Sequence, residues 1–365
     1  MALIFVEPFV RYTTAANMVK RGWVINGLTY SATGGRFGTQ GALTNTNSAH
    51  SATKAFPATP DKLIVQFAIR FSSGAFAQKF LYVLNNSGAD LILRVGISAA
   101  GAIQVFNAVN VLVHTGTAGV LVPGVWHTMA VEVQAGSATG TVRIWINQPV
   151  SGEPSPVVDL TGINLTIGSA AGADMVQLVL GSSAGRFWDI CEFMLYDLSF
   201  PIPHAYMGDK RLYALNANGE GVGGQQWTPS TGTDNAAMVD DPLNAAADGT
   251  DAMVGTYVEA TAANKLDLYT FEDLPLTATG IVAVVVELEA RKTDAGAPPG
   301  AGGLIAIISK AGVAPFNGTH DGPVLTLTTT DQIFQSIFID VPGAGVGWPT
   351  VADVNDLEAG QYLLL

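Results

Sequence analysis

The chain has 365 residues, which is room for two ordinary domains, because single hydrophobic cores stop growing at about 250 to 300 residues. Only 13% of the residues are charged, against about 25% in a typical soluble domain, so we expect other subunits to cover part of the surface. Residues 1–203 carry 11 Lys+Arg and 10 Asp+Glu, net +1, and residues 204–365 carry 6 and 20, net −14, which excludes the basic footprint that nucleic acids and anionic membranes require.

Alternation of apolar and polar residues predicts strands through the first half. In residues 63–71 the apolar side chains fall at every second position, with Gln66 and Arg70 facing the other way. Clusters of Gly, Ser, Asn and Pro separate such runs, as tight turns require. A short helix is expected only at 14–20. The predicted strands of this half are 63–71, 91–97, 103–106, 128–133, 141–146, 175–180 and 190–195.

A domain boundary is predicted at Pro201-Ile202-Pro203, because two prolines fix the backbone and remove hydrogen-bond donors directly after a strand. The second half alternates again, with a Gly- and Pro-rich loop at 291–303 and a short helix at 351–358. Its predicted strands are 212–215, 265–271, 281–289, 304–309, 324–328 and 333–341. We therefore predict an all-β protein with two antiparallel, jelly-roll-like β-sandwich domains in tandem, residues 1–203 and 204–365.

The sequence predicts neither membrane insertion nor Sec export. Its best apolar run, 280–286, is far shorter than the 18 or more residues that span a bilayer, and Glu287 and Glu289 interrupt it. Residues 1–10 have no basic leader and carry Glu7 and Pro8, which is atypical of a secretory signal.

Paired carboxylates are the first enzymatic candidates in an all-β chain, since glycosidases flank the scissile bond with two of them. Glu287 and Glu289 share one strand face, but a solvated face explains them, and the Glu-x-Asp-x-Glu run of jelly-roll glucanases is absent. No nucleophile elbow, phosphate loop or dinucleotide fingerprint is present. We predict no catalytic residue, no bound cofactor and no enzymatic activity. The histidines stand singly, outside metal-binding spacing: His50, His114, His127, His204 and His320.

Calcium is the one metal that the sequence leaves open. An acid-rich stretch contains oxygen ligands of the type that calcium takes, but their order does not match an EF-hand, so an ordinary polar loop is the favoured interpretation. Its members are Asp234, Asp240, Asp241, Asp248 and Asp251. The single cysteine, Cys191, excludes an internal disulfide and is expected to be buried and inert. Six tryptophans could stack on sugars, but most adjoin strands and are expected to anchor the core: Trp23, Trp126, Trp145, Trp188, Trp227 and Trp348.

Several segments of the first domain resemble one family. Residues 124–131 (Gly-Val-Trp-His-Thr-Met-Ala-Val) and 141–147 (Thr-Val-Arg-Ile-Trp-Ile-Asn) resemble the Trp-His strand and following hairpin of laminin-G-like, concanavalin A-like jelly rolls. Residues 192–199 resemble the closing strand of that fold, and residues 35–38 with 41–43 resemble its early turn. The calcium positions of some laminin-G-like domains are not matched residue by residue, so the resemblance supplies no site.

The second half is similar to the C-terminal module of phage structural proteins that carry such a lectin-like domain in front. The similarity rests on residues 257–259, 267–274 and 348–360. It implies a virion component assembled in the bacterial host cytoplasm, with other virion proteins as partners. Trimers are common in such appendages, so a homotrimer is favoured, although the sequence has no heptad segment to enforce one.

Three hypotheses follow. The favoured one is a non-enzymatic virion structural protein of a tailed phage, in a tail, baseplate or fibre, that mediates protein contacts and host-surface attachment; a capsid decoration protein is the alternative position. Low charge and the apolar end at 362–365, which would be sticky if exposed, motivate it. The second is an adhesin module that binds a cell-surface glycan. The third is a polysaccharide depolymerase, which would need two carboxylates about 5 to 10 Å apart in a cleft.

Overall fold

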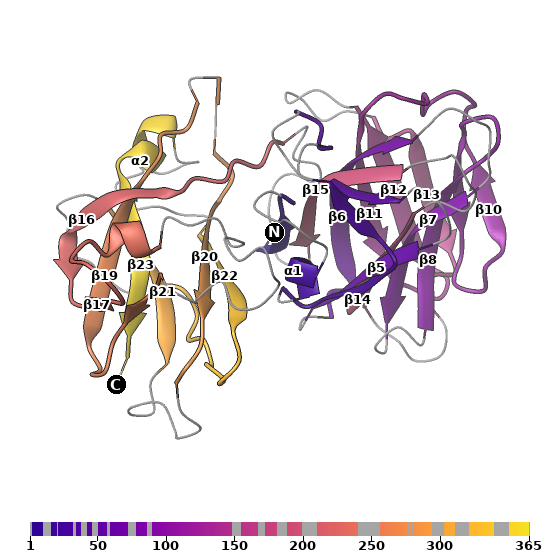
Figure 1. Cartoon of the computed structure of the whole chain (residues 1–365). Coiled ribbons are helices and arrows are strands. Elements are labelled where there is room, and N and C mark those ends of the chain that lie inside the picture. The colour runs from indigo at the N-terminus through magenta and orange to yellow at the C-terminus, as the bar shows by residue number, and fades with distance from the viewer. Residues whose placement is uncertain are drawn as a thin grey trace. The chain divides into compact units, whose positions relative to one another are not determined.

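A computed structural model of the chain describes residues 2–9, 16–19, 21–31, 34–37, 42–45, 50–56, 59–71, 78–85, 90–147, 155–166, 172–180, 188–198, 210–239, 256–275, 277–278, 281–293, 303–310, 321–338 and 350–364 (Figure 1). The chain is almost entirely β-structure and divides into two compact units, Met1–Leu212 and Tyr213–Leu365. The predicted boundary at Pro203 lies outside the described residues.

The first unit contains two antiparallel sheets, which confirms the all-β prediction. In its described part, one sheet has eight strands in the order β13-β12-β11-β6-β15-β4-β3, with β1 also paired to β15. They are β1 (Ala2–Glu7), β3 (Thr29–Ser31), β4 (Ala42–Asn45), β6 (Lys62–Phe71), β11 (His127–Gln134), β12 (Gly140–Ile146), β13 (Val158–Ile163) and β15 (Trp188–Asp197).

The other sheet of this unit has seven described strands in the order β10-β9-β8-β7-β14-β5-β2. They are β2 (Trp23–Asn26), β5 (His50–Ala55), β7 (Gln78–Asn85), β8 (Asp90–Ile97), β9 (Ile103–Phe106), β10 (Leu112–Thr115) and β14 (Met175–Leu180). The helix α1 (Ala16–Val19) precedes β2 and lies within the predicted 14–20 helix.

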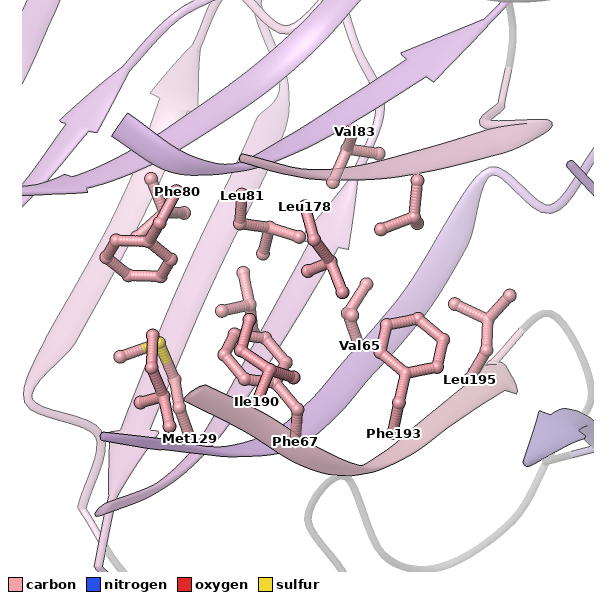
Figure 2. Close-up of a cluster of buried hydrophobic side chains, with 14 of the residues drawn as sticks. Val65, Phe67, Phe80, Leu81, Val83, Met129, Leu178, Ile190, Phe193 and Leu195 are labelled. Carbon is pink, nitrogen blue, oxygen red and sulfur yellow. The ribbon is translucent and has the colours of Figure 1, made fainter. Parts of the chain in front are cut away.

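A single hydrophobic core joins the two sheets of the first unit. Figure 2 shows side chains from the eight-stranded sheet, including Phe67, Met129 and Phe193, pointing toward Phe80 and Leu178 of the seven-stranded sheet. Each of these five is at most 1% exposed. Burying one large apolar side chain stabilises a fold by about 1.5–3 kcal/mol, so this shared core is what holds the sandwich closed.

The second unit is a smaller all-β unit with two layers. Its four-stranded sheet, in the order β16-β19-β23-β21, packs against the β20–β22 ribbon through Val286, Ile308 and Phe338. A two-stranded pairing, β17 with β18, and two short helices complete its described part. The elements are β16 (Ala217–Gln225), β17 (Thr228–Pro229), η1 (Ala236–Met238), β18 (Val258–Glu259), β19 (Lys265–Phe271), β20 (Val284–Ala290), β21 (Leu304–Lys310), β22 (Gln332–Phe338), α2 (Val351–Asn355) and β23 (Leu357–Leu363).

Several predictions for the second unit are wrong. The predicted strand at 212–215 is irregular, and the strand starts at Ala217 in a glycine-rich segment. Glycine is needed there because a Cβ on Gly221 would lie 2.9 Å from the Leu268 side chain. Residues 324–328 form no strand and share only an isolated bridge, between Leu325 and Leu304. The strand predicted at 281–289 begins only at Val284.

The C-terminal segment also differs from the prediction. The predicted helix at 351–358 ends at Asn355, with Thr350 and Asp353 forming a capping box at its start. Strand β23 follows at once and pairs with β19 on one side and β21 on the other. Leu363 is 5% exposed, so the apolar end is an interior strand of this unit and not a sticky tail.

Candidate ligand-binding face

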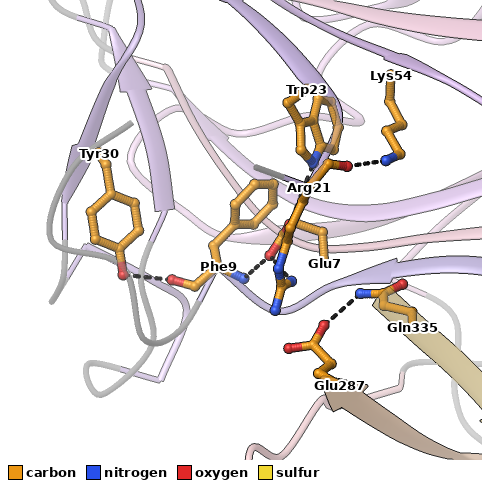
Figure 3. A network of polar contacts seen from close by, with 8 residues as sticks. All are labelled: Glu7, Phe9, Arg21, Trp23, Tyr30, Lys54, Glu287 and Gln335. Atoms are coloured by element: carbon orange, nitrogen blue, oxygen red, sulfur yellow. Dashed lines mark hydrogen bonds and ion pairs between the residues drawn. The ribbon is translucent and has the colours of Figure 1, made fainter. Parts of the chain in front are cut away.

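A buried polar network lies at one end of the first unit's core (Figure 3). The Glu7 carboxylate accepts hydrogen bonds from Arg21 Nη1 at 2.9 Å, the Phe9 amide at 3.0 Å and Trp23 Nε1 at 3.3 Å. Lys54 Nζ donates to the Arg21 carbonyl, and burial, followed by the opposing effects of Glu7 and Arg21, lowers the pKa of Lys54 to about 8. Because Glu7, Arg21 and Trp23 are at most 4% exposed and bonded to one another, the network joins β1 to the start of β2 and offers no open binding site.

The residues that carry the jelly-roll resemblance meet in space. His127 Nδ1 lies 2.6 Å from Asn147 Nδ2, and His127 Nε2 lies 3.2 Å from the Val122 carbonyl oxygen. His127 Nε2 also lies 2.9 Å from the Val122 amide nitrogen, and the Asn147 side-chain amide donates to His127 Nδ1, because an amide nitrogen cannot accept. Burial lowers the pKa of His127. Asn147 also accepts from the Thr128 amide at 3.0 Å and has a φ of 51°, which asparagine tolerates well. This group fastens the β11–β12 hairpin.

Most of the other candidate residues that the structure describes are buried or partly buried. Cys191 is fully buried, and burial first, then the Glu192 charge, raises its thiol pKa. Among the tryptophans, three are buried, Trp126 and Trp227 are partly exposed, and Trp348 lies outside the described residues. The buried ones are Trp23, Trp145 and Trp188. His50 and His114 are half-buried, whereas His204 and His320 lie outside the described residues.

Two of the candidate carboxylates, Glu287 and Asp234, accept hydrogen bonds from neighbouring residues. Glu287 Oε1 accepts a hydrogen bond from Gln335 Nε2 at 2.6 Å across the β20–β22 ribbon, as Figure 3 also shows. Asp234 accepts from the Ala237 amide at the start of η1. The remaining four aspartates of the predicted acid-rich stretch lie outside the described residues. Within the described residues, no three His, Cys, Asp or Glu side chains are grouped to hold a metal, and no helix is long and apolar enough to cross a membrane.

The two sheets of the first unit differ in the face that points away from the shared core. On the eight-stranded sheet the centre of this second face is buried too, and its residues Ile64, Gln66 and Tyr196 are at most 2% exposed, whereas β12 and β13 at one edge are partly exposed. On the seven-stranded sheet the corresponding residues are half-buried, as the alternating exposure of β9 and β14 shows. The seven-stranded sheet is thus the one whose central strands present side chains to solvent.

One row of side chains crosses this open face, with one residue from each strand. Neighbours in the row are paired across the strands, so the row runs perpendicular to them. Its central members are hydrogen-bonding and aromatic, and Gln177 Nε2 donates to Thr53 Oγ1 at 3.2 Å. The row consists of Val24, Thr53, Gln177, Tyr82, Arg94, Phe106 and Leu112.

Two cations lie on the aromatic rings of this row. The Arg94 guanidinium carbon is 4.8 Å from the Tyr82 ring centroid, and Lys79 Nζ is 4.3 Å from the Phe106 ring centroid. Lys79 Nζ also donates to Asn110 Oδ1 at 2.5 Å, from the β9–β10 turn. We call these five residues the basic aromatic cluster.

The sequence interpretation missed this cluster. The alternation of apolar and polar residues within 91–97 and 175–180 indicates that the side chains of Arg94 and Gln177 point away from the core. This alternation is the only sign of the cluster in the sequence. The pairing of β14 between β5 and β7 could not be read from the sequence, because these strands are far apart in the chain.

The chain matches no family model and no curated protein. Among solved structures it is similar to a Bacillus subtilis protein of unknown function with a galectin-like fold, at 13% identity over 54% of this chain and 96% of that one, with a TM-score of 0.39. It is also similar to the exoplasmic domain of VIP36 bound to calcium and Man3GlcNAc, at 9% identity over 50% and 85% with a TM-score of 0.34. Its match to Trypanosoma rangeli sialidase has 8% identity and a TM-score of 0.31 and spans 43% of this chain but only 25% of the sialidase. At these scores no property of those proteins is transferred to this chain.

Proposed function

We propose that this chain is a non-enzymatic structural protein of a tailed phage particle, in a tail, baseplate or fibre, and that its first unit binds a host-surface glycan. The row across the open face of the seven-stranded sheet carries the glycan part of the proposal. Sugars need several hydrogen-bonding groups together with apolar surface, and the row provides amide, hydroxyl, guanidinium and aromatic groups side by side.

Two features suit such binding. The row lies on paired strands, which hold side chains more rigidly than loops do, so binding needs little ordering. The strands from β5 to β9 are five neighbours at about 4.8 Å spacing, or about 19 Å in all, which suits an oligosaccharide better than a single sugar.

The similarity of residues 257–259, 267–274 and 348–360 to the C-terminal module of phage structural proteins, behind a first half that resembles lectin-like jelly rolls, supports the virion part of the proposal. The non-enzymatic part is supported by the engagement of Glu287 with Gln335 on a ribbon face, where a pair of catalytic carboxylates would have to be free to meet a substrate.

The glycan part is tested on an array of bacterial surface polysaccharides probed with the full chain. We expect discrete binding that Tyr82→Ala and Gln177→Ala each weaken at least about tenfold, because each removes a contact in the middle of the row. Thr141→Ala, at a half-exposed position of the eight-stranded sheet, is the matched control and should bind like the wild type. A blank array at saturating protein, or equal loss in the control, rejects glycan binding through this face.

The virion part is tested by immunogold electron microscopy of the particles whose genome encodes the chain. Label at the tail, baseplate or fibre is the expected result. Label over the head would instead favour capsid decoration, and unlabelled particles would reject the virion role.

A further inference from the structure

The two cations of the basic aromatic cluster have no anionic partner in the described part of the chain, unlike five other cations of the first unit. Within the described residues, neither Lys79 nor Arg94 lies within ion-pairing distance of a carboxylate, and the buried Arg94 Nε has no hydrogen-bond acceptor. Five other cations of this unit each lie 2.7–3.5 Å from a carboxylate oxygen. They are Arg21 with Glu7, Arg36 with Glu192, Lys62 with Glu132, Arg70 with Asp189 and Arg143 with Asp159.

The two cations are also close to each other. Arg94 pairs with Tyr82 and Phe106 across the strands, and Lys79 lies over the same Phe106 ring. Desolvation, and then the charge of Arg94, lower the pKa of Lys79. Like charges held together destabilise a site until an anion neutralises them, so the cluster gains most from a negatively charged ligand.

The position of the cations over the rings decides what the cluster can recognise. Since Arg94 covers Tyr82 and Lys79 covers Phe106, a ligand meets positive charge there before it meets a bare ring face. Arg94 still has N–H groups of its guanidinium to donate, and the planar guanidinium matches the two oxygens of a carboxylate.

We infer that the glycan bound at this face is acidic, and that Arg94 and Lys79 together bind a sugar carboxylate. This inference rests on the proposed glycan-binding function and names the substrate class of the same site. The neighbouring Gln177 and Thr53 then lie along the row at the positions of the adjoining sugar hydroxyls.

The test measures affinity by calorimetry for three acidic probes and their neutral counterparts. The probes are trigalacturonic acid, 3′-sialyllactose and a hyaluronan tetrasaccharide, each compared with its own carboxyl methyl ester. We expect at least one acid to bind at least about tenfold more tightly than its ester, since the neutral ester cannot form charge-assisted hydrogen bonds with the two cations. The affinity for that acid should fall as salt is raised, whereas the affinity for its ester should not.

Substitutions of the two cations test whether they cause the preference for the acid over its ester. Lys79→Met and Arg94→Gln should each weaken the preferred acid at least about fivefold and leave the ester unchanged. Arg143→Gln is the control, because it removes one positive charge from the other sheet of the same unit. Thermal unfolding of each variant reports folding, and the acid-against-ester comparison on the wild-type chain does not depend on any variant.

The outcomes separate this inference from the proposed function. If sugars bind but no acid exceeds its ester, glycan binding stands and the acidic preference is overturned. If neither acids nor esters bind and the polysaccharide array is also blank, the proposed function itself fails. If polyaspartate displaces the sugar or binds more tightly than any acid, the occupant is an acidic protein surface, which includes the acidic second unit of another copy, and the inference is wrong.

Discussion

The buried carboxylate of Asp267 is expected to hold the second unit together, and Asp267→Ala tests this. Asp267 is fully buried, and its oxygens accept hydrogen bonds from the Gln226 amide at 2.6 Å, the Trp227 amide at 2.9 Å, Asn235 Nδ2 at 2.6 Å and the Tyr269 hydroxyl at 3.0 Å. One of these donors has a second acceptor, because the Gln226 amide also reaches the Leu266 carbonyl. Asn235 Nδ2 uses its other hydrogen to donate to the Trp227 carbonyl.

The alanine variant therefore leaves three groups without an acceptor, the Trp227 amide, one Asn235 side-chain N–H and the Tyr269 hydroxyl. A hydrogen bond to a charged group contributes about 1.5–3 kcal/mol, so their loss sums to about 4.5–9 kcal/mol. Removing the charge also removes its desolvation cost, which offsets part of that loss. We expect the free energy of unfolding of the second unit to fall by about 3 kcal/mol.

Hydrogen exchange followed by mass spectrometry measures the two units separately. Peptides from β19 and β16 should lose protection in Asp267→Ala, while peptides from β6 and β11 keep it. Asp267→Asn is the matched control, because it retains one oxygen acceptor for the two backbone amides and should lose about half as much. A loss below about 1 kcal/mol, or equal loss in both units, would refute this account of the carboxylate.

Three further predictions follow from buried groups. Burial lowers the pKa of His127 below its unfolded value of about 6.5, so the unfolded state binds more protons in acid. The contribution of His127 to stability should therefore be complete above about pH 6.5 and decrease below it. His127→Gln should flatten this pH dependence in denaturant titrations, and an unchanged slope would contradict the prediction. Because burial raises the thiol pKa of Cys191, a thiol reagent should react with it only after denaturation, and rapid reaction of the native protein would place the thiol at the surface. Leu363→Asp should destabilise the second unit by at least about 2 kcal/mol in thermal unfolding, because Leu363 is buried in a strand paired on both sides. Leu112→Asp, at an exposed position, is the control and should change the stability little.

Sequence reasoning succeeded where one face of a strand is buried and the other is not. The strands at 103–106 and 175–180 alternate strictly in exposure, and their predicted bounds match those of β9 and β14. It failed where other forces decide the structure. The glycines of β16 carry no hydrophobic pattern, so the sequence does not predict that strand. The start of β23 has the composition of a helix, and only its pairing with two neighbouring strands identifies it as a strand.

The candidate binding face was beyond sequence reasoning for a topological reason. Its row is assembled from residues between Val24 and Gln177, and adjacent members such as Gln177 and Thr53 are separated by more than half of the first unit. Alternation says which way a side chain points, but not which strand lies beside it. The distribution of charged residues along the sequence did not predict the basic aromatic cluster either. A cation without a carboxylate partner is recognised only when the three-dimensional neighbours of all the cations are known.

The pairing of β1 with β15 constrains how the first unit is made. Ala2 lies opposite Asp197, so β1 is synthesised well before the strand with which it pairs. Contacts of such long sequence separation form slowly, and β1 lacks this sheet partner until β15 has been made. A nascent chain arrested before residue 188 would therefore carry a sandwich without β15, an interior strand of the eight-stranded sheet.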